Sequence, residues 1–140
     1  MARPGYSMGT KAGGGGQVKS LIVTLAGMTL EALVARTAKI QMPETGKIIA
    51  VTANVAAKGG TPGTDTLDVT AAGTSLLAAT FNLNTIVAGT PVQKVSTDLS
   101  ATADEVAKDT EIRFTTAQSG GSSPTVAHLT VQVDYVPLGD

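Results

Sequence analysis

Apolar and polar residues alternate along several short segments of this chain, and this period of two constrains the fold more than any other feature. Because successive side chains of a strand point to opposite faces, such alternation predicts half-buried β-strands. The clearest segment lies near the C-terminus, where the apolar positions are Leu129, Val131, Val133 and Tyr135. The same pattern recurs at Leu21, Val23 and Leu25; at Ile49, Val51, Ala53 and Val55; at Leu67 and Val69; and at Ile112 and Phe114.

Turn signals rich in Gly, Pro, Ser and Thr separate these segments. They are residues 45–46, 59–63, 72–74, 88–91 and 119–124. Short strands that alternate with such turns are typical of two packed antiparallel sheets. The sequence therefore predicts an all-β protein, an antiparallel β-sandwich.

Two segments leave a choice between strand and helix. Leu30, Leu33, Val34, Thr37 and Ala38 match helical spacing, with Thr29 as a cap and Pro43 as a stop. The period-two set in the same segment is Leu30, Ala32, Val34, Ala38 and Ile40. We favour a strand there, since an isolated helix is less common in a sandwich. The second segment, residues 103–108, is compatible with one helical turn in a loop.

Residues 1–17 are expected to form a flexible N-terminal arm. The arm contains Arg3-Pro4-Gly5 and a run of four glycines at 13–16, which lose too much backbone entropy to order alone. Fully extended, the arm would reach roughly 50 to 60 Å at about 3.3 Å per residue. Residues 18–140 are expected to form one β-sandwich domain. The glycines precede Lys19-Ser20 but follow no strand, so they do not predict a phosphate-binding loop.

The composition argues against an enzyme. The chain has no Cys and a single His, His128, and it lacks the Gly-x-Ser-x-Gly elbow of a serine hydrolase. Asp65 and Asp68 stand three residues apart, so in a regular strand they would point to opposite faces and could not share acid-base work. If Asp65 lies in a loop, Ca²⁺ coordination with Thr64 is an alternative, although the spacing matches no known cage. We expect no catalytic residues, no metal and no cofactor.

Net charge and hydropathy restrict the classes of partner that this chain is expected to bind. A formal net charge of −1 gives no electrostatic footprint for nucleic acid, and no apolar run is long enough to span a bilayer. The first twenty residues have no apolar centre of a signal peptide, so we expect synthesis in a cytoplasm. Aromatic residues make up 3% of the chain, so the core must be built from small aliphatic side chains. Without Cys, a domain with so modest a core is expected to gain stability by homo-oligomerisation.

Residues 40–135 resemble small structural β-sandwich proteins of tailed bacteriophages, which serve as capsid decoration, cement or fibre components. The resemblance lies in the segments PETGKI (43–48), DTLDV (65–69), GTSLL (73–77), KDTEI (108–112) and LTVQV (129–133). The chain departs from that pattern at KDTEI, where such proteins usually open the strand with Gly-Asp.

The resemblance implies a jelly-roll-like sandwich, commonly a trimer, on the outer capsid surface of a virion made in a bacterial host cytoplasm. It also implies a decoration or cement role in which the protein bridges subunits of the major capsid protein. Within the arm we single out Arg3, Tyr6 and Lys11 as candidate partner-binding residues, with Tyr6 as a pocket-filling anchor and the cations as partners for coat carboxylates. The alternatives are a carbohydrate- or receptor-binding head-fibre module, and a tail-tube or assembly protein.

Overall fold

A computed structural model describes residues 17–25, 31–32, 37–61, 64–119, 122–127 and 129–139. Among these residues the chain is all-β and every strand pairing is antiparallel. Within these ranges the helical segments are short 3-10 turns, η3 (Leu83–Thr85), η4 (Ser96–Asp98) and η5 (Ala101–Asp104). The predicted all-β fold class is confirmed.

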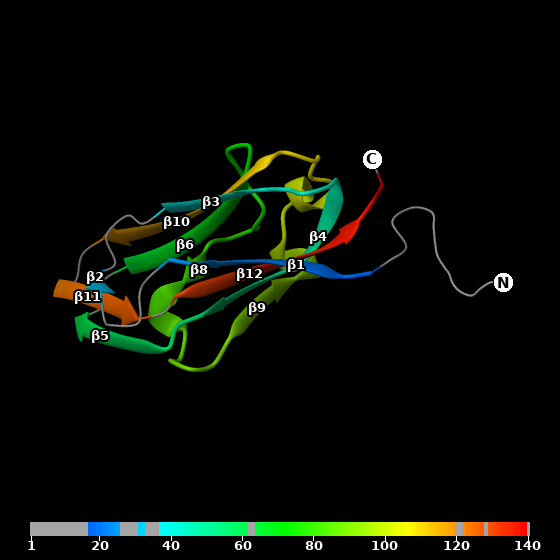
Figure 1. The fold of residues 1–140 in the computed structure, drawn as a ribbon. Coiled ribbons are helices and arrows are strands. Elements are labelled where there is room, and N and C mark those ends of the chain that lie inside the picture. The colour runs from blue at the N-terminus through cyan, green and yellow to red at the C-terminus, as the bar shows by residue number, and fades with distance from the viewer. Residues whose placement is uncertain are drawn as a thin grey trace.

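Two larger sheets form the body of the molecule (Figure 1). The first has the order β1-β12-β4-β9 and the second the order β3-β10-β6-β7, with β8 also paired to β6. The first sheet comprises β1 (Lys19–Thr24), β12 (Thr130–Pro137), β4 (Gly46–Asn54) and β9 (Val92–Val95). The second comprises β3 (Thr37–Gln41), β10 (Glu111–Ser119), β6 (Thr64–Ala71), β7 (Thr74–Ser75) and β8 (Phe81–Asn82).

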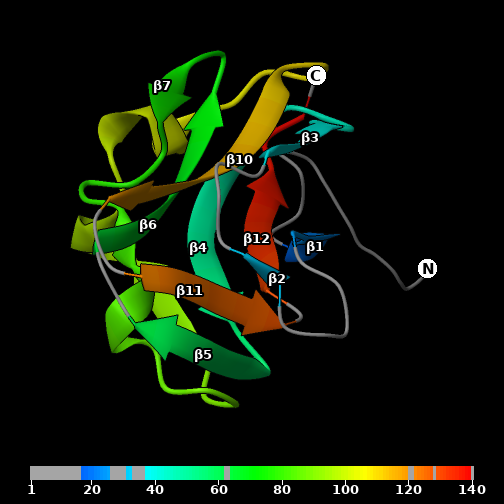
Figure 2. The ribbon, with the colours of Figure 1, turned by 90° about the vertical axis from the view of Figure 1, so that its left-hand side faces the viewer.

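A small third sheet lies across one end of the sandwich (Figure 2). Its order is β2-β11-β5, from β2 (Glu31–Ala32), β11 (Ser122–Ala127) and β5 (Ala57–Thr61). Each of these strands belongs to a connection between one large sheet and the other, so the third sheet ties three connections together.

The order of strands along the chain is that of a jelly roll. After β1 in the first sheet, the chain passes to β3 in the second, back to β4, and across again to β6 and β7. It then returns to β9, crosses to β10 and ends in β12, beside β1. Eight principal strands in two sheets with this exchange define the double Greek key of jelly rolls. The predicted antiparallel sandwich is thereby confirmed, and the strand order is the one that the resemblance implied.

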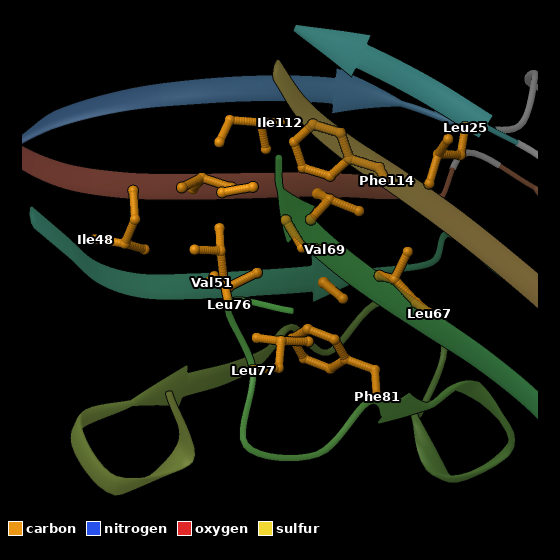
Figure 3. Packing of buried hydrophobic residues seen from close by; sticks show 14 of the residues in the cluster. Leu25, Ile48, Val51, Leu67, Val69, Leu76, Leu77, Phe81, Ile112 and Phe114 are labelled. Atoms are coloured by element: carbon orange, nitrogen blue, oxygen red, sulfur yellow. The ribbon is translucent and has the colours of Figure 1, made fainter. Parts of the chain in front are cut away.

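The core lies between the two large sheets and is built mainly from aliphatic side chains, as the composition predicted. Figure 3 shows Val51 of β4 facing Val69 and Leu67 of β6, with Ile112 and Phe114 of β10 above them. Tyr135 and the two Phe residues are also buried, at 2% exposure or less. The three aromatic residues within the described ranges therefore serve the core, as expected.

The period-two pattern locates the strands correctly but misplaces one side chain. We expected Ile49 to share the core face with Val51, yet Ile48 is the buried residue and Ile49 is half-buried. The pairing of β4 with β12 shifts register between Asp134 and Tyr135, which marks a β-bulge at this point. A bulge inserts one extra residue, so every side chain beyond it changes face.

Several predicted turns are strand residues in the structure. Residues 59–61 of the glycine-rich signal lie within β5, and Pro124 lies within β11, where the pairing is irregular between Ser122 and Thr125. Irregular pairing of this kind is where a strand tolerates Gly and Pro. Gly46, predicted in a turn, is the first residue of β4, and the position requires glycine because a Cβ there would stand 2.6 Å from Cδ2 of Tyr135. The signals at 72–74 and 88–91 are confirmed as turns, with Gly73 and Gly89 at positive φ.

The two ambiguous segments are partly resolved. Within residues 30–40 the structure has β2 and β3, so the described part of this segment is strand, as favoured, and not helix. Residues 33–36 lie outside the described ranges. Residues 103–108 are compatible with one helical turn, and the structure has such a turn a few residues earlier, as η5, while Val106 forms an isolated bridge with Gly46.

Candidate binding surface

The three arm residues singled out from the sequence, Arg3, Tyr6 and Lys11, lie outside the described residues, and so does His128. The predicted arm-binding role therefore stays a prediction. What the structure describes is the surface next to the point where the arm joins the body. That surface consists of the outward face of the first large sheet and the edge strand β1.

Apart from Lys47 at the start of β4, which pairs with Val136, the outward face of the first sheet carries little charge. The register aligns Ser20, Asp134, Ala50 and Val95 in one row across four strands, and Ile22, Gln132, Thr52 and Gln93 in the next. Thr24, Thr130 and Asn54 form a third row. We call these eleven residues the outer face. Asp134 is the one charged side chain among them, and Ile22 and Val95 are 57% and 38% exposed.

The carboxylate of Asp134 accepts hydrogen bonds from other residues of the outer face. Oγ of Ser20 donates a hydrogen bond to Oδ1 of Asp134 over 2.6 Å, and Nε2 of Gln132 donates to the same oxygen over 2.9 Å. Hydrogen bonds to an ionised carboxylate are stronger than those between neutral groups and compensate part of its charge. The polar half of each alternating strand predicted these side chains on one face, but the sequence did not indicate that they form a single network.

The outward face of the second sheet is different, because it carries charges of both signs. Arg113 Nη2 lies 2.9 Å from Oε1 of Glu111, and Lys39 Nζ lies 3.8 Å from Oε2 of the same residue. Asp68 is on this face as well, where its Oδ1 accepts a hydrogen bond from Ser75 Oγ over 2.5 Å. Cores of protein interfaces are depleted in charged side chains. By that criterion the outer face of the first sheet is the better candidate for contact with another protein.

In the part of the chain that the structure describes, no element covers the side of the sandwich formed by β1 and β3. Both strands end their sheets, and Figure 2 shows them on the same side of the body. Four aliphatic side chains of these strands pack against the core but remain only partly buried: Leu21, Val23, Ala38 and Ile40. We call this the open side.

The opposite side, between β7 and β9, is sealed by the chain itself. Leu76 and Leu77 follow β7, and Phe81, Leu83 and Ile86 follow in the crossing to β9; all five are at most 4% exposed. Backbone hydrogen bonds join this crossing to the segment after β9, since Ala78 N donates to Asp98 O and Ser100 N to Leu76 O. We call this the sealed side.

A small polar cluster lies where the arm would leave β1. Glu44 Oε2 accepts a hydrogen bond from Tyr135 Oη over 3.0 Å and lies 2.7 Å from Lys19 Nζ. Burial, together with the hydrogen bond and charge of Glu44, raises the pKa of Tyr135 to about 12. The cluster holds the first residue of β1 against the body.

Asp65 is the one buried acid among the described residues, at 3% exposure. It lies on the inward face of β6, while Asp68 lies on the outward face, so the predicted opposition of the two carboxylates is confirmed. Oδ1 of Asp65 has no hydrogen-bond partner. Burial raises the pKa of Asp65, and the charge of Lys58 partly offsets this effect. Because Asp65 is part of a strand, the loop position on which the calcium alternative depended is not observed.

A shallow hollow of about 350 Å³ lies between β4 and the segment that contains η4 and η5. Its lining includes the apolar residues Ile48, Leu99 and Ala103 and the charged residues Lys47 and Asp104. Within the described ranges, no group of three or more His, Cys, Asp or Glu side chains is placed to hold a metal ion. In the same ranges no helix is long and apolar enough to cross a membrane.

Comparisons with known proteins assign no family. No family model matches the chain, and no curated protein matches it. Among solved structures, the chain is similar to a chain in the structure of the Gx strain of infectious bursal disease virus. The identity is 14% and the TM-score 0.32, over 89% of this chain and 38% of the viral chain. The chain thus spans well under half the length of that structure's chain, and a likeness this distant carries no functional argument.

Proposed function

We propose that this chain is a virion structural protein, a decoration or cement protein that binds the outside of a bacteriophage head. In this role it bridges subunits of the major capsid protein, stabilises the shell and catalyses no reaction. The observation that supports the proposal most is the charge-poor outer face on a jelly-roll scaffold, next to the open edge of β1. The sequence resemblance to phage structural proteins points the same way.

The outer face suits adhesion. Exposed aliphatic side chains such as Ile22 contribute to affinity when they leave water, and the uncharged Ser, Thr and Gln side chains of the face adapt to hydrogen-bond partners. Asp134 adds little desolvation cost, because its carboxylate already accepts two hydrogen bonds within the face.

Repetition on a shell would strengthen contacts of this kind. We propose that the protein acts as a homo-oligomer, with a trimer favoured, and that several copies engage neighbouring coat subunits at once. Linked contacts raise the effective concentration of each further contact, so weak individual contacts hold firmly. In this proposal the arm adds Arg3, Tyr6 and Lys11 to the contact with the coat.

The test uses empty capsids of the virus that encodes the chain, with the full chain and a form that lacks residues 1–17. Size-exclusion chromatography with light scattering first establishes the oligomeric state of each form. Co-sedimentation with capsids is expected for the full chain, and a lower bound fraction for the shortened form. Undiminished binding by the shortened form would discard the arm contribution, and no binding by either form would overturn the proposed function.

A glycan array run in parallel separates the alternative of a carbohydrate-binding head-fibre module. Sugar sites commonly present aromatic ring faces, but Phe81, Phe114 and Tyr135 are all buried. We therefore expect no glycan to be retained. Retention of a defined glycan, without affinity for capsids, would replace the proposed function by the alternative.

A further inference from the structure

The hollow beside η4 and η5 is a gap in the pairing of the first sheet. β9 pairs with residues 50–53 of β4, and the chain leaves the sheet after Val95. It rejoins β4 at an isolated bridge, in which Gly46 N donates to Val106 O over 2.9 Å and Val106 N donates to Gly46 O over 2.8 Å. No described strand pairs with residues 47–49 on this side, and these residues line the hollow.

The segment that spans the gap, residues 96–105, is held in place by the second sheet. Ser100 N donates a hydrogen bond to Leu76 O over 2.8 Å, and Ser100 Oγ donates to Ser75 O over 2.6 Å. These acceptors lie in and directly after β7. The walls of the hollow are therefore preformed, and a preformed site loses less entropy when a partner binds.

The hollow adjoins the outer face. One row of that face includes Val95, and the next residue along the chain, Ser96, lines the hollow. Lys47, another lining residue, lies on the outward side because it alternates with the buried Ile48. A partner bound to the outer face therefore lies beside the hollow.

The lining combines apolar side chains with two opposite charges. Ile48 and Ala103 are 1% and 2% exposed, and Leu99 is half-buried. Lys47 and Asp104 are exposed, and neither has an ion pair or a side-chain hydrogen bond within the described part of the chain. A segment that carries an apolar side chain, one carboxylate and one cation would match all three features of this lining.

We propose that the hollow receives a loop of the coat subunit. An apolar side chain of this loop packs against Ile48 and Leu99, a carboxylate pairs with Lys47, and a cation pairs with Asp104. The proposal rests on the proposed function and names the contact that fixes the orientation of the protein on the shell. Complementary charges set the register of an interface, while an anchoring side chain in a pocket supplies affinity.

The size of the hollow favours a protein loop over a free small molecule. Its volume of about 350 Å³ lies near the lower limit of ligand pockets, which is about 300 Å³. Such pockets enclose most of the surface of a small ligand. Because this hollow is shallow, it suits one protruding side chain whose remaining surface is covered by its own protein.

Filling the hollow tests the proposal. Ala101 is an exposed lining residue, and Ala107 is exposed in the same connection but outside the lining. Ala101→Trp is expected to lower the affinity for empty capsids at least ~10-fold, since the ring takes the place of the anchoring side chain. Ala107→Trp adds the same ring outside the hollow and is expected to bind like wild type. Urea unfolding checks that both variants are folded.

A charge exchange tests the same contact without added bulk. Lys47→Glu combined with Asp104→Lys leaves the net charge unchanged but reverses both charges of the lining. This exchange is expected to weaken capsid binding at least ~10-fold, because like charges then face each other in the contact. The matched control, Glu105→Lys combined with Lys108→Glu, exchanges two exposed charges outside the lining and should bind like wild type.

The outcomes separate this proposal from the proposed function. If wild type binds capsids and both Ala101→Trp and the exchange of Lys47 and Asp104 bind equally well, the proposed contact is overturned and the proposed function stands. No binding by wild type would overturn both. If Ala101→Trp changes the oligomeric state in light scattering and leaves capsid binding unchanged, the hollow binds a second copy, which also overturns the proposal.

Discussion

The two sides of the sandwich are closed in different ways. On the sealed side, Phe81, Leu83 and Ile86 cross from one sheet to the other and are almost fully buried. On the open side, Leu21, Val23, Ala38 and Ile40 keep part of their surface in water, and two strand edges end side by side (Figure 2). Among the described residues, loops of the chain thus complete the core on the sealed side, whereas no element covers the open side. We infer that stability is concentrated on the sealed side.

The largest loss of stability is expected from a substitution at Phe81 on the sealed side. Phe81→Ala should lower the free energy of unfolding by about 3 to 5 kcal/mol, since it removes a buried ring and leaves a cavity. Urea unfolding followed by circular dichroism measures the change. A loss below about 1 kcal/mol would show that the sealed side does not carry the stability assigned to it.

Leu21→Ala measures how much a side chain on the open side contributes to the free energy of unfolding. Because the side chain is already partly exposed, the loss should be about 1 to 2 kcal/mol, smaller than for a fully buried leucine. Urea unfolding followed by circular dichroism measures this loss. A loss as large as that of Phe81→Ala would contradict the difference between the two sides.

Asp65 tests a weakness near the start of β6, where it is buried near Lys58. Its pKa is raised by burial, so the folded state holds the proton to a higher pH than the unfolded chain does. Stability is therefore lost as pH rises from the ordinary carboxyl range through the raised pKa. Asp65→Asn should increase the free energy of unfolding by about 1 kcal/mol at pH 7.

Urea titrations of wild type and Asp65→Asn at pH 4 and pH 7 measure this difference. The increase in the free energy of unfolding on substitution should be smaller at pH 4, where the wild-type carboxyl is closer to neutral in both the folded and the unfolded state. A variant that is less stable than wild type at pH 7 would contradict an unpartnered carboxylate at this position.

The smallest loss of stability is expected from a substitution on the charged outward face of the second sheet. Glu111→Gln removes the ion pairs with Arg113 and Lys39, which are exposed to solvent. Such pairs contribute little, so the loss should not exceed about 0.5 kcal/mol, and less in high salt. Urea unfolding at low and high salt checks this value. A loss above 1 kcal/mol would mean that the ion pairs of this face also contribute substantially to the stability of the fold.

The strands could be predicted from the sequence because one face of each is buried. The alternation at Leu129, Val131, Val133 and Tyr135 matches β12 residue for residue. Ile48 could not be assigned, since the bulge opposite Tyr135 depends on pairing with a distant strand. The glycines of β5 were misjudged for the same reason: their partners in β11 lie about sixty residues away, and local composition carries no information about them.

The candidate surface was less predictable than the fold. Alternation placed Gln132 and Asp134 on a polar face, but the charge-poor character of that face emerges only when four strands are aligned. The open side likewise depends on β1 and β3 ending their sheets on the same side. Sheet order is a property of the whole chain, and the turn signals do not encode it.

The central claim is that the protein works by adhesion through its outer face, and one pair of variants tests it most directly. Ile22→Asp puts a charge on the exposed aliphatic side chain that the outer face presents from β1, and Ala117→Asp puts the same charge at an exposed site on the second sheet. Both variants should unfold at nearly the wild-type urea concentration. In co-sedimentation with empty capsids, we predict that Ile22→Asp loses binding by at least ~10-fold, as expected of a side chain buried in an interface, while Ala117→Asp binds like wild type. Equal binding by the two variants would contradict the account.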